Sequence, residues 1–223
     1  MSITKKGVKR QYGIEPGLVL WLPFDGDVRD YSGNSNHGLN YGASWATGKV
    51  GNTLSFDGVN NYVKTVSFGL SGTALTVSAW VKCALSTTMN QTILSDAAQS
   101  ATIGYIFTYR GISSNMLVWQ YAGGNDWYNA GAANFFLGYD NVLLHVTVVC
   151  DYTNKIVYFY RNGALFSTVA MSGTPVFPST NRSRYIGTYS GTSSFFLGII
   201  DEVRIYNRAL RADEIWDLYQ RGL

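Results

Sequence analysis

The sequence predicts an all-β fold: two antiparallel sheets packed face to face, with one short helix at the C-terminal end. Short apolar runs recur along the chain, and clusters of turn residues separate them. No helical pattern alternates with these runs, and only the segment Arg211–Tyr219 carries apolar side chains at helical spacing. The chain has 223 residues, enough for one sizeable hydrophobic core. These observations favour a single β-sandwich domain.

The expected strands begin at Leu18–Leu22, which stops before Pro23 because proline cannot continue a central ladder. In the segment LTVSAWVK, alternate residues are apolar, as in a strand with one face in the core. In chain order, further strands are expected at residues 54–56, 62–66, 75–82, 92–94, 104–109, 116–121, 143–149, 155–161, 164–169, 184–186 and 197–206.

Two local signals are stronger than the rest. Asn162-Gly163 predicts a tight hairpin, because both residues readily adopt positive φ. In the expected helix, the apolar residues Ile215 and Leu218 share one face, and acidic residues occupy the first turn, where the helix dipole favours them.

The charge of the chain is small and uneven. The net charge of +3 does not by itself indicate nucleic-acid binding. We expect a basic N-terminal arm over residues 1–16, ahead of a globular domain over residues 17–223. Such an arm is either a solvated tail or an anchor for self-assembly, for an acidic partner or for nucleic acid. The cationic residues of this arm are Lys5, Lys6, Lys9 and Arg10.

No signal peptide and no membrane-spanning run is recognisable in the sequence. The expected location is therefore the surface of a virion or other particle, or release from the cell, and otherwise the cytoplasm. The two cysteines, Cys83 and Cys150, each end an apolar run. They are expected to be buried thiols, with one disulfide as the alternative if their strands face each other.

Six segments in chain order resemble the laminin G-like (concanavalin A-like) jelly-roll domains. They are GLVLWLPFDGDVRDYSGNSNHG, LSFDGVNNYV, LTVSAWVK, HVTVVCD, VYFYRNG and IDEVRIYNRALRADEI. Two positions depart from the family pattern: Leu144 replaces an aromatic residue, and Arg211 replaces the usual Ser or Thr helix cap. The resemblance implies a two-sheet jelly-roll sandwich, in a family that binds sugars or proteins more often than it cleaves glycans.

The sequence does not predict an enzyme. Glycosidases of this fold that resemble laminarinases carry a Glu-x-Asp-x-x-Glu strand, whereas this chain has three glutamates, Glu15, Glu202 and Glu214, and none of them has such a partner. Asp201 and Glu202 are adjacent and are expected to point to opposite faces of a strand. His145, in an apolar strand, is expected to be a core histidine, and its pairing with Cys150 as a nucleophile is not favoured.

A calcium ion is one candidate ligand. The resemblance implies that the region after the first strand meets the Asp of the IDEV segment, which implicates Asp25, Asp30 and Asp201 as ligands of a structural Ca²⁺. The alternative is that these aspartates accept hydrogen bonds from their own turns.

A second candidate is a glycan or protein surface. Aromatic and amide side chains gather near GGNDWYN, and sugars are held by aromatic rings and by amide or carboxylate groups. The expected ligand-binding residues are Tyr121, Asn125, Asp126, Trp127 and Tyr128. Trp119 is expected in the core instead.

The sequence thus favours a non-catalytic, lectin-like surface module. We expect a structural or attachment component of a virus or phage particle, or of another surface assembly, with a capacity to bind glycans. The alternative is a carbohydrate-binding module that assists a separate glycan-degrading enzyme.

Overall fold

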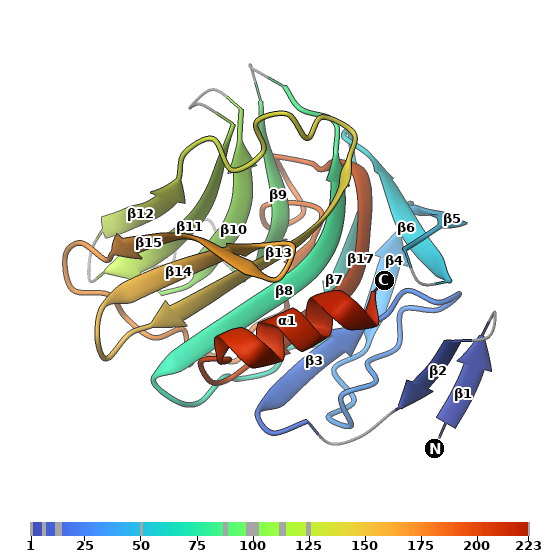
Figure 1. Cartoon of the computed structure of the whole chain (residues 1–223), viewed down its shortest axis with the longest axis horizontal. Coiled ribbons are helices and arrows are strands. Elements are labelled where there is room, and N and C mark those ends of the chain that lie inside the picture. Colours follow the sequence, from blue (N-terminus) through green and yellow to red (C-terminus); the bar gives the residue numbers. More distant parts are fainter. Residues whose placement is uncertain are drawn as a thin grey trace.

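The computed structural model of the chain describes residues 2–5, 8–11, 15–49, 51–86, 89–96, 103–111, 115–123 and 126–222, the first two of these ranges by their backbone alone (Figure 1). Two antiparallel sheets face each other, as the sequence predicted. Within the described residues, no helix is long and apolar enough to span a bilayer.

One sheet has seven strands. Across the sheet they are β12 (Asp126–Ala132), β11 (Met116–Gly123), β10 (Tyr105–Arg110), β9 (Asn90–Ser95), β16 (Tyr185–Ile186), β7 (Tyr62–Thr65) and β4 (Gly38–Tyr41). This sheet forms the back of the view in Figure 1.

The other sheet has eight strands. Across it lie β15 (Ala164–Ala170), β14 (Ile156–Arg161), β13 (Leu143–Asp151), β8 (Ala74–Cys83), β17 (Leu197–Tyr206), β6 (Asn52–Asp57) and β5 (Ser44–Thr47), and β3 (Leu18–Leu22) also pairs with β17.

The main hydrophobic core fills the space between the sheets. Alternate residues of the strands supply it, including Val77 of β8 and Phe107 of β10, both fully buried. Trp119 of β11 is also fully buried and stacks on Tyr105, with ring centroids 4.6 Å apart. The prediction that Trp119 belongs to the core is confirmed.

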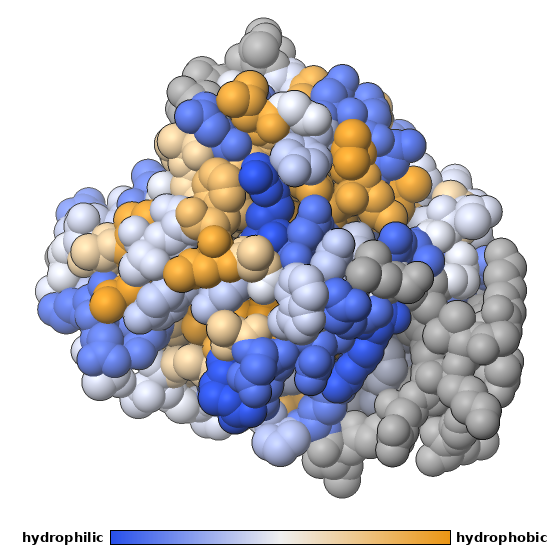
Figure 2. Space-filling view, in the orientation of Figure 1, coloured by the Kyte–Doolittle hydropathy of each residue, from blue (hydrophilic) through white to orange (hydrophobic). Residues whose placement is uncertain are grey.

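A second, smaller core lies on the outer face of the eight-stranded sheet. The helix α1 (Ala212–Arg221) crosses this face (Figure 1) and buries Ile215 and Leu218 against Trp21 and Tyr206. Its other face carries hydrophilic side chains, which appear as a blue region over the helix in Figure 2. One amphipathic helix therefore covers part of one sheet.

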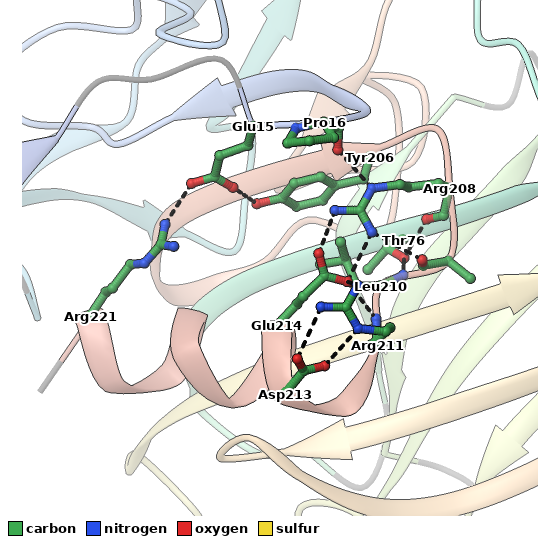
Figure 3. Close-up of polar contacts among 11 residues, drawn as sticks. Glu15, Pro16, Thr76, Tyr206, Arg208, Leu210, Arg211, Asp213, Glu214 and Arg221 are labelled. Atoms are coloured by element: carbon green, nitrogen blue, oxygen red, sulfur yellow. Dashed lines mark hydrogen bonds and ion pairs between the residues drawn. The ribbon is translucent and has the colours of Figure 1, made fainter.

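The helix begins without a side-chain cap at Arg211, as expected from the missing Ser or Thr. Glu214 compensates in part, because its carboxylate accepts a hydrogen bond from the backbone N–H of Arg211 at 2.8 Å. The same carboxylate pairs with Arg208, whose hydrogen bond lowers the pKa of Glu214 to about 2 (Figure 3).

The segment ahead of β3 is bound to the last strand and the helix. The Glu15 carboxylate accepts hydrogen bonds from the Tyr206 hydroxyl and from the Arg221 guanidinium, and Arg208 Nε donates to the carbonyl of Pro16 at 2.7 Å (Figure 3). Residues 15 and 16, expected in the arm, thus make contacts with the sandwich.

The basic part of the expected arm contains a two-stranded hairpin, β1 (Ser2–Lys5) and β2 (Val8–Gln11). Lys5, Lys9 and Arg10 lie in its strands, and Lys6 lies outside the described residues. The anchoring role of these cations stays a prediction.

Most predicted elements are present, and two strands match to the residue: β3 at Leu18–Leu22 and β17 at Leu197–Tyr206. The Asn162-Gly163 turn joins β14 to β15 with φ of 51° and 80°, which confirms the predicted hairpin. The polar loop expected at GGNDWYN is wrong in part, because its second half is the edge strand β12, paired along its whole length with β11.

Candidate functional site

A pocket of about 270 Å³ opens on the outer face of the seven-stranded sheet, on the side opposite α1. Four neighbouring strands and one loop line it. From the strands come Asn90, Thr92, Ile106, Thr108, Arg110, Gln120 and Trp127, and from the loop between β16 and β17 come Tyr189 and Ser194.

The pleat of the sheet explains why these residues meet. Ile106, Thr108 and Arg110 are alternate residues of β10, so they share one face, while Phe107 and Tyr109 between them enter the core. In the antiparallel register, Asn90 of β9 pairs with Arg110, and Gln120 of β11 pairs with Ile106. The pairing therefore gathers one polar surface from three separate stretches of sequence.

The pocket holds an unsatisfied hydrogen-bond donor and an unsatisfied acceptor. Arg110 Nη2 donates to Asn129 Oδ1 of β12 at 3.2 Å, yet Arg110 Nε is buried and has no partner in the described part of the chain. The Oδ1 atom of Asn90, the cross-strand neighbour of Arg110, is likewise buried and unpartnered there. Burial also lowers the pKa of Arg110. Buried polar groups are rarely left without partners, so both atoms indicate a ligand or an ordered water.

Aromatic side chains border the polar floor. Trp127, partly exposed on the edge strand β12, and Tyr189, in the loop that follows β16, both line the pocket. The loop is held by the backbone N–H of Tyr189, which donates to the carbonyl of Ser193 at 2.9 Å. A half-exposed ring beside hydroxyl and amide groups can pack on the apolar face of a sugar.

The five predicted ligand-binding residues do not form one site. Of the four that the structure describes, only Trp127 lines the pocket. Tyr121 is fully buried and exchanges hydrogen bonds with the backbone of Ser172, so its assignment to a ligand surface is corrected: it faces the core. Tyr128, its cross-strand partner, stacks on it at 6.0 Å, on the same side of the sheet.

Asp126 is exposed and shares the side of Tyr128, because alternate strand residues point the same way. The pleat thus places Asp126 and Tyr128 on the face of β12 opposite Trp127. Asn125 lies outside the described residues.

Sequence reasoning missed Arg110, Asn90 and Gln120. Each is an ordinary polar residue in an alternating strand and has no motif around it. The available signal was the alternation of polar with apolar residues in the strands at residues 104–110 and 116–121. The polar residues can be recognised as one site only when the register between the strands is known.

The three predicted calcium ligands have separate roles in the structure. Both carboxylate oxygens of Asp30 are engaged: Oδ1 accepts from the backbone N–H of Trp21 and Ser32, and Oδ2 accepts from Asn36 N and the Ser32 hydroxyl. Asp30 is buried and fastens its loop to β3, so it does not fit as a calcium ligand.

Asp25 and Asp201 meet the same turn. Asp201 Oδ2 accepts from Lys49 N at 3.1 Å, and Asp25 Oδ1 accepts from Asn52 N at 3.0 Å. Across the described residues, no three His, Cys, Asp or Glu side chains gather closely enough to hold a metal ion. The three aspartates thus do not form one carboxylate cluster in the described part of the chain, and the calcium site stays a prediction.

Glu202 follows Asp201 at a bulge in β17 and has a φ of 54°. Its carboxylate accepts from the indole N–H of Trp21 at 2.9 Å and pairs with Arg204 at 2.8 Å, and the Arg204 guanidinium lies 4.5 Å from the Trp21 ring. These contacts give Glu202 a place in the packing under α1.

Three further predictions concern buried groups. His145 is 1% exposed, with Nε2 2.9 Å from Ser78 Oγ, which confirms a core histidine. Cys83 and Cys150 are buried free thiols, so the disulfide alternative is wrong. Burial raises the pKa of both thiols.

Known structures share this fold. Domain 4 of AbnA, a GH43 extracellular arabinanase from Geobacillus stearothermophilus, in complex with arabinotriose, superposes with a TM-score of 0.74 at 24% identity, over 92% of this chain and 100% of that one. The binding domain of Paraclostridial Mosquitocidal Protein 1 gives 0.71 at 16% identity, over 91% of this chain and 52% of that one.

The binding domain of botulinum neurotoxin serotype G gives a TM-score of 0.72 at 16% identity, over 90% of this chain and 50% of that one. The chain thus spans about half the length of each toxin binding domain. At these identities the likeness shows the fold.

No curated protein sequence has significant similarity to the chain. A laminin G-like family model, described as the concanavalin A-like lectin/glucanases superfamily, matches residues 57–216. This match covers the strands from β7 to β17 and the first half of α1, including every described residue that lines the pocket. The chain therefore belongs to the concanavalin A-like lectin/glucanases superfamily.

Proposed function

We propose that this chain is a non-catalytic glycan-binding module, with its ligand in the pocket on the outer face of the seven-stranded sheet. One observation carries the proposal: a buried donor, Arg110 Nε, and a buried acceptor, Asn90 Oδ1, are both unpartnered among the described residues of a pocket bordered by Trp127.

A sugar matches this combination. A hydroxyl group both donates and accepts, so one or two hydroxyls of a pyranose or furanose ring can satisfy the two unpartnered atoms. The remaining polar lining includes Thr92 and Gln120, which offer further donors and acceptors, and Thr108, whose hydroxyl donates to the carbonyl of Gln91 and can still accept. Trp127 offers a ring for the apolar face of the sugar.

The pocket also supports a binding role over a hydrolytic one. Glycoside hydrolysis uses two carboxyl groups on either side of the scissile bond. None of the described residues that line the pocket is an aspartate or a glutamate. The described lining therefore offers hydrogen bonds and an aromatic surface, but no carboxyl group to act as general acid or as nucleophile.

Two neighbours in fold support a glycan ligand. Domain 4 of the arabinanase was solved with arabinotriose. The second neighbour is a structure of botulinum neurotoxin type C, whose entry into cells depends on interaction with two ganglioside molecules; it matches with a TM-score of 0.70 at 15% identity, over 93% of this chain and 51% of that one. The arabinanase domain also favours the second candidate function, an accessory module that keeps a separate enzyme on its polysaccharide.

An attachment role is compatible with the same site. A particle-surface component would use the pocket to bind host glycans and the basic segment Lys5–Arg10 to join its assembly. The hairpin β1–β2 is what supports an anchor, because strands can pair with another chain.

The test is a glycan array, followed by calorimetric titration of the best ligands with Trp127→Ala and Trp216→Ala. Trp216 is 48% exposed on α1, at the opposite side of the molecule, so it is a matched control. We expect Trp127→Ala to weaken binding about tenfold or more with an unchanged Tm, and Trp216→Ala to leave it unchanged. Equal binding by all three proteins would contradict the proposed site.

A further inference from the structure

We propose that the pocket selects a sugar that carries a carboxylate, a uronic or sialic acid, and that Arg110 binds this carboxylate. The inference rests on the proposed glycan-binding function and adds the chemical class of the ligand.

The charge of the pocket is the first argument. Among the described residues that line it, Arg110 is the one ionisable cation, and none is acidic. Within the described residues, every ion pair joins other side chains, and none includes Arg110. Arg110 therefore lies in the pocket as a cation with no counterion from the described part of the chain.

The burial of Arg110 is the second argument. Arg110 as a whole is partly buried, whereas its Nε atom is buried. Taking part of a guanidinium out of water costs free energy, which proteins normally offset with a counterion and with hydrogen bonds. Burial is the one cause that lowers the pKa of Arg110, with no opposing contribution from a neighbouring carboxylate. The missing partner is an anion small enough for a pocket of about 270 Å³.

The orientation of the guanidinium is the third argument. Asn129 fixes the Nη2 end through its 3.2 Å hydrogen bond, while Nε on the adjacent edge is buried and unpartnered in the described part of the chain. Arginine binds a carboxylate best through two neighbouring N–H groups in one plane. A carboxylate placed against this edge accepts from Nε directly, in a guanidinium that is already held in position.

Asn90 completes the arrangement. Its amide is the cross-strand neighbour of Arg110 and can present either its oxygen or its NH₂ group to the pocket by turning about its last bond. With NH₂ turned inward, Asn90 donates to the second carboxylate oxygen. With oxygen turned inward, it accepts from a sugar hydroxyl next to the carboxylate. Both orientations suit an acidic sugar, and Trp127 and Tyr189 supply the aromatic border for its ring.

The experiment compares acidic oligosaccharides with their neutral counterparts by calorimetric titration of the full chain. The pairs are oligogalacturonate with its carboxyl-reduced form, and sialyllactose with lactose. We expect the acidic member of at least one pair to bind about tenfold tighter than its neutral counterpart, with a preference that shrinks at high salt. The third ligand is a neutral oligosaccharide that carries a sulfate group. We expect its sulfate not to give the tighter binding that the carboxylate gives.

The variants are Arg110→Gln, Arg110→Lys and Lys64→Gln. Lys64 has its ammonium 5.5 Å from the Tyr185 ring on the same sheet face, so Lys64→Gln makes the same change in net charge away from the pocket. Arg110→Gln should abolish the preference for the acidic sugar, Arg110→Lys should retain part of it, and Lys64→Gln should retain it fully. The Tm of each variant establishes that it folds.

The outcomes separate this inference from the proposed function. If acidic and neutral members bind equally and Arg110→Gln weakens both alike, or if only neutral glycans bind on the array, the acidic-sugar inference is overturned and the glycan-binding function stands. If no glycan on the array binds at all, both are overturned.

Discussion

The carboxylate of Glu15 accepts a hydrogen bond from the hydroxyl of Tyr206 over 2.6 Å, so a residue ahead of the first sandwich strand is joined to the end of the last one. Burial by itself raises the pKa of Glu15, but this bond and the charges of Arg204 and Arg221 lower it on balance. Glu15 and Pro16, at the end of the expected arm, are therefore bound to the sandwich, and the boundary of the arm stays a prediction.

Replacing Glu15 with Gln should lower the free energy of unfolding by about 1 kcal/mol. The reason is that the amide has no negative charge to pair with Arg221 and accepts a weaker hydrogen bond from Tyr206. Urea denaturation measures the change. Asp213→Asn is the control, since Asp213 and Arg211 form an ion pair with side chains 68% and 70% exposed, and its loss should have little effect. Equal losses in the two variants would contradict a special role for Glu15.

The anchoring prediction for the basic segment requires a deletion that spares Glu15. Removing residues 1–14 should leave the far-UV circular dichroism of the sandwich and its Tm unchanged. If Lys5, Lys6, Lys9 and Arg10 anchor the chain, the deletion should turn an oligomer into a monomer by size-exclusion chromatography with light scattering. An intact oligomer after deletion, or a monomer before it, would rule the anchor out.

His145 should make the protein sensitive to acid. Burial, with a smaller contribution from the charge of Arg204, lowers the pKa of His145 from 6.5 to about 3. The folded state therefore binds this proton less tightly than the unfolded state, so the stability that neutral His145 contributes is present above pH 6.5 and is lost as the pH falls from there toward 3. Denaturation curves recorded across this range measure the slope.

His145→Gln is the test variant, and its stability should depend less on pH than that of the wild type between pH 6.5 and 3. Asp96 contributes with the opposite sign, because burial raises its pKa to about 6 and its protonation favours the folded state. Asp96→Asn removes this second contribution, so the difference between the pH profile of Asp96→Asn and that of the double variant isolates the histidine. Parallel pH profiles for wild type and His145→Gln would contradict the prediction.

Asp30 should stabilise the fold independently of calcium. Asp30→Ala removes an acceptor for four donors and should cost about 3 kcal/mol, equally with Ca²⁺ and with a chelator. Differential scanning calorimetry in the two buffers checks this, with Asp201→Ala run alongside. A penalty that appears only with Ca²⁺ would restore Asp30 as a metal ligand.

The strands could be predicted because one face of each packs in the core, and alternation along the sequence records this directly. Leu197–Tyr206 is an example, since its apolar residues and the turn residues on either side predict the same strand. The edge strand β12 could not be recognised, because Asp126–Ala132 follows two glycines and itself contains Asp, Asn and Gly, which are depleted in strands. Its pairing with β11 supplies the hydrogen bonds that this composition does not predict.

Most of the candidate site could not be predicted from the sequence. Trp127 was recognised as an exposed aromatic residue, but Tyr121 was assigned to the same surface because the sequence does not show which face of a strand each residue occupies. Asn90 and Arg110 are twenty positions apart, and they become neighbours only in the register of β9 and β10.

The pocket and the helix lie on opposite sides of the sandwich, and Glu15, just ahead of the first sandwich strand, meets Arg221, the last residue of the helix, on the helix side. A fusion partner or a solid support joined directly ahead of Glu15 or after the helix would therefore leave the pocket facing outward. Copies immobilised in this way would present their pockets in parallel toward a glycan-coated surface. In that arrangement, weak individual contacts add up through avidity.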